Sequence, residues 1–310
     1  MTLHATEEAL TPPEPTLGRA RTAFGMLLND KLALLAAIFL LIVVISALFG
    51  PLLIGDLATK LGLRQRNLAP FQLEHGWAYI LGADTLGRSM LARLIVGAQN
   101  TLGIAAAAVV TSMLIGGSLG LVAGYSNRWF SHLIMRVADV IMSFPSLLLA
   151  LIVLYTLGPS TTNLIFVLAV TRIPVYLRTT RAEVLELRSR MFVSAAKSMG
   201  AGSLRIVLRH IAPLTIPTLI TIAAVDFATV ILAESALSFL GLGIQAPEFT
   251  WGAMVATGRG YLSNAWWIAF WPGLAIMLTT LSLNLLSSWA RTAADPQQRW
   301  RLQTLRRTKR

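Results

Sequence analysis

Long apolar runs separated by short polar stretches dominate the chain. The first run begins at Leu32 and continues to Ile54. Its 23 residues would extend about 35 Å as a helix, enough to cross a bilayer core of about 30 Å. Five further runs are long enough to cross in the same way, so the pattern predicts six spanning helices. Their expected ranges are 31–54, 101–124, 137–157, 161–178, 214–237 and 266–289.

Two of these spans contain residues that shape helix packing. Gly116, Gly120 and Gly124 recur every four residues in the second span, and such a stripe of small residues lets another helix approach closely. Pro145 lies inside the third span, where a proline frees a backbone carbonyl and kinks the helix. A polar turn is expected before that span, at 125–136.

The region 55–98 is mixed in character and leads into the second span. Asp84 is expected to cap a helix that begins at Thr85. Apolar residues then follow at a spacing of four, so this helix is expected to lie along the membrane before the chain turns into it. The pattern therefore predicts an extracytoplasmic loop with a membrane-lying helix.

Composition supports a membrane protein and excludes several other classes. Hydrophobic residues make up 55% of the 310 residues and charged residues only 13%, about half the share in globular proteins. The net charge of +12 could attract nucleic acid, but the basic residues flank apolar runs, which favours a membrane protein without a nucleic-acid partner. The absence of cysteine excludes disulfides and thiolate chemistry.

The distribution of basic residues predicts that both termini are cytoplasmic. With the termini inside, 20 of the 26 Lys and Arg residues fall on the cytoplasmic side and 6 on the other. Positive charge of this kind marks the cytoplasmic face of multi-pass proteins. The tails at 1–30 and 291–310 and the polar interruption after the fourth span would then face the cytoplasm.

That interruption runs over 180–217, and two short helices are predicted in it. Apolar residues over 184–199 recur every three or four positions, as on one face of a helix. Gly200 breaks the pattern, and Ser203 is expected to cap a second helix over 204–211. A helix this short is marginal in water, so it needs a surface to pack against in this chain or in a partner.

The same interruption resembles the coupling loop, over 180–213 here, of ABC-importer permease subunits. The residues that carry the resemblance are Ser194, Ala195, Ala196, Gly200 and Pro213. Ser194 stands where that family usually has glutamate. In the family the loop docks into a groove on a cytoplasmic ATPase. The further residues to which the resemblance gives a docking role here are Ser203, Leu204, Arg205 and Leu208.

Two other stretches resemble the subclass of these permeases that serves dipeptides, oligopeptides and nickel. In one, Asp84, Gly87 and Arg88 match the motif that precedes the second spanning helix. The other begins at Glu234 and reads ESALSFLGLGIQAPEFTWGAM. In the subclass this second stretch folds back on the outer side of the membrane.

The resemblance implies an all-α polytopic membrane protein with the type I ABC importer permease fold, whose core of five helices occupies 99–290. It also implies a heterodimer with a homologous permease, two ATPase subunits and an extracytoplasmic substrate-binding protein, in a bacterial inner membrane. The chain has no G-x-x-x-x-G-K-[ST] phosphate loop, so ATP and Mg²⁺ are expected on the partners. We find no catalytic or metal-ligand spacing, and the chain is not expected to be an enzyme or to bind a cofactor.

Asp226 and Glu234 lie inside the fifth predicted span. Acids in a spanning helix are costly and usually face the bundle interior or a water-filled path, so both are candidates for the translocation path. The alternative for each is a satisfied hydrogen bond between helices.

Other functions stay open at this point. A peptide importer is favoured, with nickel or another small solute as the alternative substrate. A secondary transporter could couple protons or sodium through Asp226 and Glu234, but the inverted repeats typical of that class are not evident. An intramembrane hydrolase would rest on Ser118, which lies in a G-x-S-x-G pattern that requires a strand-turn-helix context.

Overall fold

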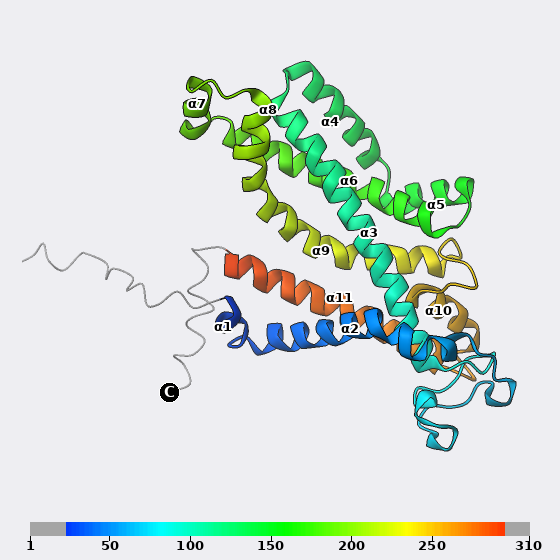
Figure 1. The fold of residues 1–310 in the computed structure, drawn as a ribbon. Coiled ribbons are helices and arrows are strands. Elements are labelled where there is room, and N and C mark those ends of the chain that lie inside the picture. The colour runs from blue at the N-terminus through cyan, green and yellow to red at the C-terminus, as the bar shows by residue number, and fades with distance from the viewer. Residues whose placement is uncertain (1–22, 295–310) are drawn as a thin grey trace, which may run out of the picture.

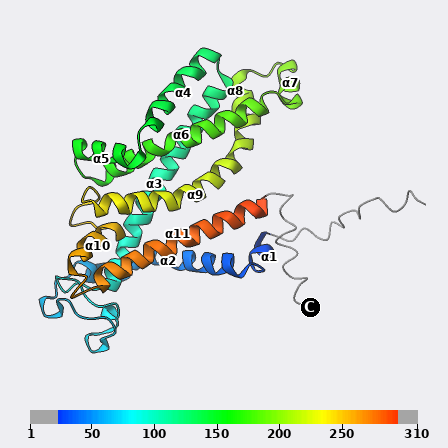
Figure 2. The same ribbon diagram turned by 180° about the vertical axis from the view of Figure 1, so that it is seen from behind.

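The computed structural model describes residues 23–294, and every regular element of that range is a helix (Figures 1 and 2). The long helices are α2 (Lys31–Thr59), α3 (Met90–Tyr125), α4 (Arg128–Ser143), α5 (Ser146–Leu157), α6 (Thr161–Leu187), α9 (Ala212–Phe239) and α11 (Trp267–Ala294). The short ones are α1 (Ala23–Leu27), α7 (Met191–Ser198), α8 (Ser203–Ile206) and α10 (Trp251–Gly258), with a π-helical turn at Val207–Ile211 and short 3₁₀ turns at Leu63–Gln65, Leu73–His75, Trp77–Tyr79 and Arg259–Tyr261.

Five of the six predicted spans each fall on one helix of the structure, and the third is divided between α4 and α5. Four helices in the described range are long and apolar enough to cross a membrane: α2, α3, the continuous helix from α8 to α9, and α11. The bent pair of α4 and α5 makes a fifth span if it is counted as one. The fourth predicted span became α6, which is long but carries Arg172 and Arg178 and does not pass the same test. An all-α, multi-pass architecture is therefore confirmed, whereas the exact count of six is not.

The third predicted span differs from expectation at both its ends and its centre. The expected polar turn at 125–136 is only two residues long, because the Asn127 side chain accepts a hydrogen bond from the N–H of Phe130 at 2.9 Å and starts α4 there. At Pro145 the helix does not merely kink: α4 and α5 meet at 88°. A proline disfavours helical geometry in the residue before it, so Phe144 is extended and the helix restarts after the proline.

The second span begins later than predicted. The Ser89 hydroxyl accepts a hydrogen bond from the N–H of Ala92, so Ser89 rather than Asp84 caps α3. From Met90 the helix continues unbroken for 36 residues, and no separate membrane-lying helix precedes it. Asp84 instead organises the loop before the helix.

The predicted glycine stripe is confirmed, and it joins α3 to α6. A Cβ atom built on Gly116 would lie 2.6 Å from the Ile173 carbonyl oxygen. One on Gly120 would lie 2.5 Å from the Thr180 Cβ. Because these distances leave no room for a side chain, the two backbones can approach this closely only with glycine on α3. We call this contact the glycine seam: Gly116, Gly120 and Gly124 on α3 against residues 173–184 of α6.

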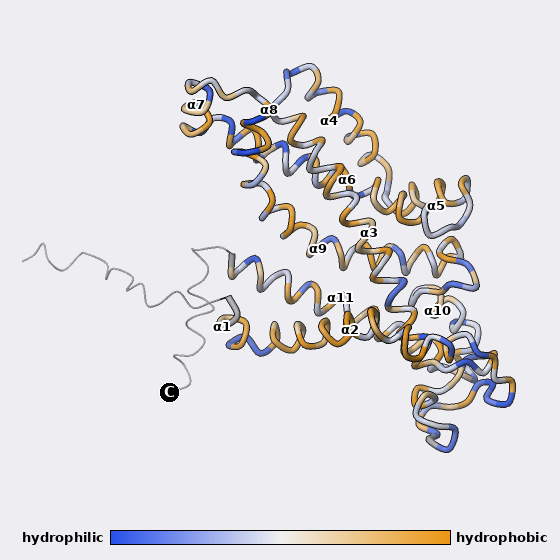
Figure 3. Tube along the Cα trace, viewed as in Figure 1, coloured by the Kyte–Doolittle hydropathy of each residue, from blue (hydrophilic) through white to orange (hydrophobic). Residues whose placement is uncertain are grey.

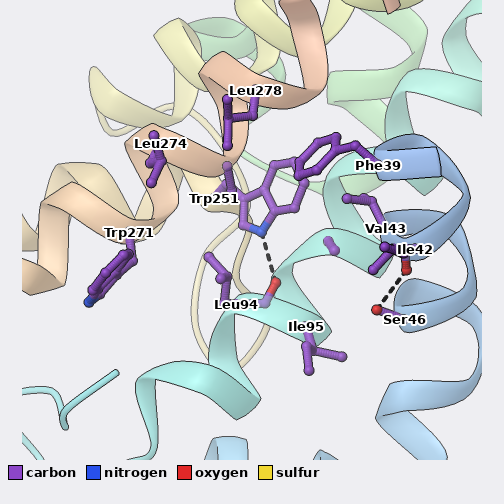
Figure 4. Close-up of a pocket in the computed structure, with 12 residues that line it drawn as sticks. Phe39, Ile42, Val43, Ser46, Leu94, Ile95, Trp251, Trp271, Leu274 and Leu278 are labelled. Carbon is purple, nitrogen blue, oxygen red and sulfur yellow. Dashed lines mark hydrogen bonds between the residues drawn. The ribbon is translucent and has the colours of Figure 1, made fainter. Parts of the chain in front are cut away.

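The helices α2 and α11 form a second group that lies beside α3 (Figures 1 and 2). Figure 3 shows α2 as hydrophobic along almost all of its length. An apolar groove of about 190 Å³ lies between α2, α3 and α11 (Figure 4). Its floor is Trp251 of α10, whose indole N–H donates to the Leu94 carbonyl at 2.8 Å and ties α10 to the beginning of α3. The fold thus fixes one end of α3 to α10 and its other half to α6.

Replacing Gly120 by alanine tests the seam. The added methyl would overlap Thr180, and overpacking of this kind typically costs about 1–3 kcal/mol. Gly103, also on α3, has nothing within 4 Å of the equivalent position, so Gly103→Ala is the matched control and is expected to be neutral or slightly stabilising. Thermal unfolding of the purified chain in detergent should show a lower melting temperature for Gly120→Ala only. Equal melting temperatures for the two variants would contradict a tight seam.

Candidate functional site

The connection from α6 to α9, residues 188–211, is the candidate site, and we call it the interhelical segment. It lies at one end of the bundle, beside the ends of α3 and α6 (Figures 1 and 2). The predicted helix over 184–199 is two helices in the structure, because α6 ends at Leu187 and α7 begins at Met191. Arg190 caps α7 with extended backbone and pairs with Glu186 at 2.5 Å.

A Schellman turn ends α7 and sets the direction of the following chain. The N–H of Ala201 donates to the Ala196 carbonyl at 3.0 Å, and the N–H of Gly200 donates to the Lys197 carbonyl at 2.9 Å. Gly200 has φ +84°, a left-handed conformation that glycine adopts without steric cost. Ala196 and Ala201 both contact the cluster beneath, which is the apolar contact that accompanies such turns.

The interhelical segment has a small hydrophobic cluster of its own, separate from the main core of the bundle. The buried members are Val184, Val193, Ala196, Ile206 and Ile211. Leu121 and Tyr125 from the end of α3 pack against them, as does Leu187 from α6. Lys197 adds a contact, with its ammonium 5.7 Å from the centre of the Tyr125 ring. The segment is therefore braced on the two helices of the glycine seam.

Four large apolar side chains of this segment point away from that cluster. They are Met191 (89% exposed), Met199 (82%), Leu204 (73%) and Leu208 (59%). We call these four residues the docking face. A hollow of about 260 Å³ beside it is lined by Ala196, Met199, Ala201, Arg205, Arg209 and His210. Exposed apolar side chains beside basic groups are typical of a protein–protein contact rather than of a solvated loop.

The predicted second helix is not a short, isolated one. It starts at Ser203 after Gly202, which caps it without a side-chain hydrogen bond, so Ser203 is the first helical residue and not the cap. The helix passes through the π-helical turn and continues directly into α9. Pro213 lies inside this continuous helix and does not end it, because the π-helical turn directly before it, where the Ala212 N–H donates to the Val207 carbonyl, accommodates the proline. Leu204 and Leu208 of the docking face therefore lie on the same continuous helix as α9.

The remaining predicted residues of the segment are divided between its two sides. Ser194, Ala195, Ser203 and Arg205 are exposed, and Ala196 is buried. Ser194, where the resemblance leads one to expect an acid, donates its backbone N–H to the Arg190 carbonyl at 3.4 Å, and its side chain forms no hydrogen bond among those described. The Schellman turn, the cluster and Lys197 therefore brace the segment without a carboxylate at that position.

Within the bundle, α6 is held to its neighbours by arginine pairs. Arg172 forms an ion pair with the buried Asp226 of α9, and Arg178 forms one with Asp139 of α4. Asp139 and Arg178 are 39 residues apart in the chain. The sequence does not predict these ion pairs, because each one depends on which helices lie side by side in the folded chain.

The second intramembrane acid, Glu234, is completely buried at the junction of α9 and α10. The Ser238 hydroxyl donates to one of its oxygens at 2.6 Å, and Thr250 donates to Ser238 at 3.4 Å. Gly252 allows α10 to pack closely here, since a Cβ at that position would lie 2.6 Å from the Ser235 Cα. The described hydrogen bonds of Glu234 come from Ser235 and Ser238 on its own helix, and Ser238 links it to Thr250 at the start of α10. Glu234 is therefore joined to α10 through Ser238, and a role in the translocation path stays a prediction.

Asp84, Gly87 and Arg88 come together at the opposite end of the bundle from the interhelical segment. Asp84 accepts hydrogen bonds from the N–H groups of Leu86 and Arg88, both at 2.9 Å, and pairs with the Arg88 guanidinium at 2.7 Å. Gly87 has φ +73°, and a Cβ there would lie 1.7 Å from the Gly62 carbonyl oxygen. These residues build the loop that leads into α3.

Nothing in the described residues resembles a catalytic or metal site. No group of three or more His, Cys, Asp or Glu side chains is placed to hold a metal ion between 23 and 294. Ser118 lies in the middle of α3, not on a strand-to-helix turn, so its G-x-S-x-G pattern is part of the glycine seam helix.

The described chain is thus a bundle of long, mostly apolar helices with an exposed segment braced at one end. A family model described as "Binding-protein-dependent transport system inner membrane component" matches residues 116–300. This chain belongs to that family of transport permeases.

Similar proteins are found in several bacteria. The chain is 37% identical over 279 residues, 90% of each chain, to the "Dipeptide transport system permease protein DppC" of Alkalihalophilus pseudofirmus. It is 40% identical over 271 residues to the "Di/tripeptide transport system permease protein DppC" of Pseudomonas aeruginosa, covering 87% of this chain and 89% of the relative. It is also 38% identical over 270 residues to the "Glutathione transport system permease protein GsiD" of Escherichia coli O6:K15:H31, covering 87% and 88%.

Replacing Gly200 by serine tests the Schellman turn. A residue with a Cβ in the left-handed region costs about 1–2 kcal/mol, so Gly200→Ser should loosen α7 from its cluster. Gly202→Ser is the matched control, because Gly202 is an N-cap with φ −68° where serine is favoured. Proteolysis of membrane-embedded protein should cut the interhelical segment faster in Gly200→Ser alone. Equal cleavage rates would contradict the importance of the turn.

Proposed function

We propose that this chain is a permease subunit of an ATP-driven ABC importer for peptides, and that the docking face binds a groove on a cytoplasmic ATPase subunit. The docking face itself is the observation that supports this most strongly. Leu204 and Leu208 are exposed at the start of a helix that runs into the membrane. The chain has no phosphate loop of its own, so ATP and Mg²⁺ would bind to the partner.

The complete importer would contain a second, homologous permease, two ATPases and an extracytoplasmic substrate-binding protein. The names of the relatives, which refer to dipeptide, di/tripeptide and glutathione transport, support a peptide substrate over nickel or another small solute. The excess of basic residues supports an inner-membrane orientation with both termini and the docking face in the cytoplasm.

The mechanism would be a change between two states of the bundle. Closure of the ATPases would move the docking face, and the continuous helix through α8 and α9 would carry that movement into the membrane. Arg188, the first residue after α6, donates to the Gly124 carbonyl at 3.0 Å and ties the segment to α3. ATP shifts the population of states because the ATPases bind the docking face differently in each.

The translocation path would pass the Arg172–Asp226 pair rather than Glu234. Arg172 lines a small hollow of about 40 Å³ between α5, α6 and α9, where Thr171 and Thr229 are also polar, and buried atoms of both members of the pair have no partner in the described chain. Glu234 is enclosed and already hydrogen-bonded, which suits a brace between α9 and α10. A secondary transporter would instead need both acids to exchange protons or sodium.

Replacing Leu204 by aspartate tests the proposal. A charge in the centre of an apolar contact should abolish co-purification of the ATPases and reduce ATP-dependent dipeptide uptake by at least about tenfold. Leu63→Asp is the matched control. Leu63 is equally exposed, at 72%, but it follows α2 at the end of the bundle opposite the docking face. That variant should keep its ATPases.

Three results would contradict the proposal. Normal co-purification of the ATPases with Leu204→Asp would show that the docking face does not bind them. Dipeptide uptake that persists after ATP depletion but collapses with an uncoupler would favour the secondary transporter. Nickel uptake without dipeptide uptake would reassign the substrate and leave the docking assignment in place.

A further inference from the structure

A second cavity, distinct from the docking face, lies where α3, α4 and α6 meet. It has a volume of about 360 Å³, within the range of roughly 300–1,000 Å³ that is usual for small-molecule sites. Its polar lining residues are Ser126, Arg128, Ser131, His132, Arg181 and Arg188. We call it the basic pocket. It lies at the same end of the bundle as the interhelical segment, since its lining includes Gly124, next to Tyr125 of the cluster.

Positive charge in the basic pocket is not balanced by an acid. None of the lining residues is Asp or Glu. Arg181 donates to the Ser131 hydroxyl at 2.9 Å and Arg188 to the Gly124 carbonyl at 3.0 Å, so both bind neutral groups, and none of the described ion pairs includes Arg128. By contrast, Arg172 and Arg178, which lie on α6 like Arg181, each form an ion pair with a carboxylate. Three guanidinium groups without a counter-charge are a site for an anion.

The beginning of α4 adds to this potential. The 16-residue helix starts at Arg128, beside the pocket, and the positive end of its dipole lies there. Guanidinium groups and a helix N-terminus together match the oxygens of a phosphate group, which accept several charge-assisted hydrogen bonds.

An apolar stripe runs along α4 from the same point. Trp129, Leu133, Val137 and Val140 recur every three or four residues, and all four are exposed. These positions share one face of the helix, so the stripe begins one residue after Arg128 and continues for about three turns. A free phosphate would leave this stripe unused, whereas a phospholipid would use both the basic pocket and the stripe.

We propose that the basic pocket binds the phosphate headgroup of an anionic phospholipid, whose acyl chains lie along the apolar face of α4. Basic pockets between helices at the cytoplasmic side of a membrane are the known type of site for such headgroups. Arg188 is both a lining residue and the link between α6 and α3, so a bound headgroup would contact the junction from which the interhelical segment starts. Inorganic phosphate shares the headgroup chemistry but not the acyl chains.

The test is native mass spectrometry of the full-length chain, delipidated in detergent and titrated with phosphatidylglycerol, with phosphatidylcholine of the same acyl chains, and with inorganic phosphate. Phosphatidylglycerol should bind most tightly. The double variant Arg128→Gln/Arg188→Gln should weaken that binding about thirtyfold, because each basic group near an anionic lipid contributes a factor of about five. Arg64→Gln/Arg66→Gln, which removes the same charge from exposed positions at the opposite end of the bundle, is the control and should change it less than about twofold.

Several outcomes would overturn the proposal. Equal affinity for phosphatidylglycerol and phosphatidylcholine would mean that the pocket does not select lipids by the charge of their headgroup. Displacement of the lipid by an equal concentration of inorganic phosphate would make it a site for a free anion. Binding unchanged in the pocket variant would place the lipid elsewhere. Arg128→Gln alone, at a position with no described ion pair, should still weaken binding about fivefold, so misfolding of the double variant would not remove the test.

Discussion

The close approach of α3 and α6 along the glycine seam is the contact on which the other features depend. Without it, the end of α3 could not support the interhelical segment, because Leu121 and Tyr125 are positioned by the same helix pair. The ion pairs of α6 then connect this unit to α4 through Asp139 and to α9 through Asp226. Packing of small residues drives such association in a membrane, where apolar side chains gain nothing by leaving lipid. The ion pairs of α6 therefore supplement a contact between α3 and α6 that the close packing of the glycine seam determines.

Two hydrophobic clusters stabilise different parts of the chain. The larger core joins α2, α3, α5, α6, α9, α10 and α11, while the smaller one holds the interhelical segment to the ends of α3 and α6. Force on Leu204 would pass into α9 along a continuous helix and into α6 through Ile206 and Val184. The segment is thus a rigid lever attached at two points, and the basic pocket with Arg188 lies next to one of them.

Much of this could be predicted from the sequence, for reasons that are physical. Apolar length places the spanning helices, and the four-residue repeat of Gly116, Gly120 and Gly124 predicts a close helix contact, because both signals are local. The partners of Asp139 and Asp226 could not be predicted, since they depend on three-dimensional neighbours. The continuation of the helix past Pro213 could not be predicted for a different reason: it depends on the π-helical turn at Val207–Ile211, which the pattern of apolar and polar residues does not indicate.

The central claim is that the docking face is covered by an ATPase subunit in the assembled importer. The chain contains no cysteine, so a single cysteine introduced at Leu208 can be labelled without background. The most direct measurement is the rate at which a membrane-impermeant thiol reagent labels Leu208→Cys in inside-out vesicles, with and without the ATPase subunits. We predict a loss of labelling of at least about tenfold when the ATPases are present, with no change for a cysteine at the exposed Arg136. Equal labelling at Leu208 in both preparations would contradict the account.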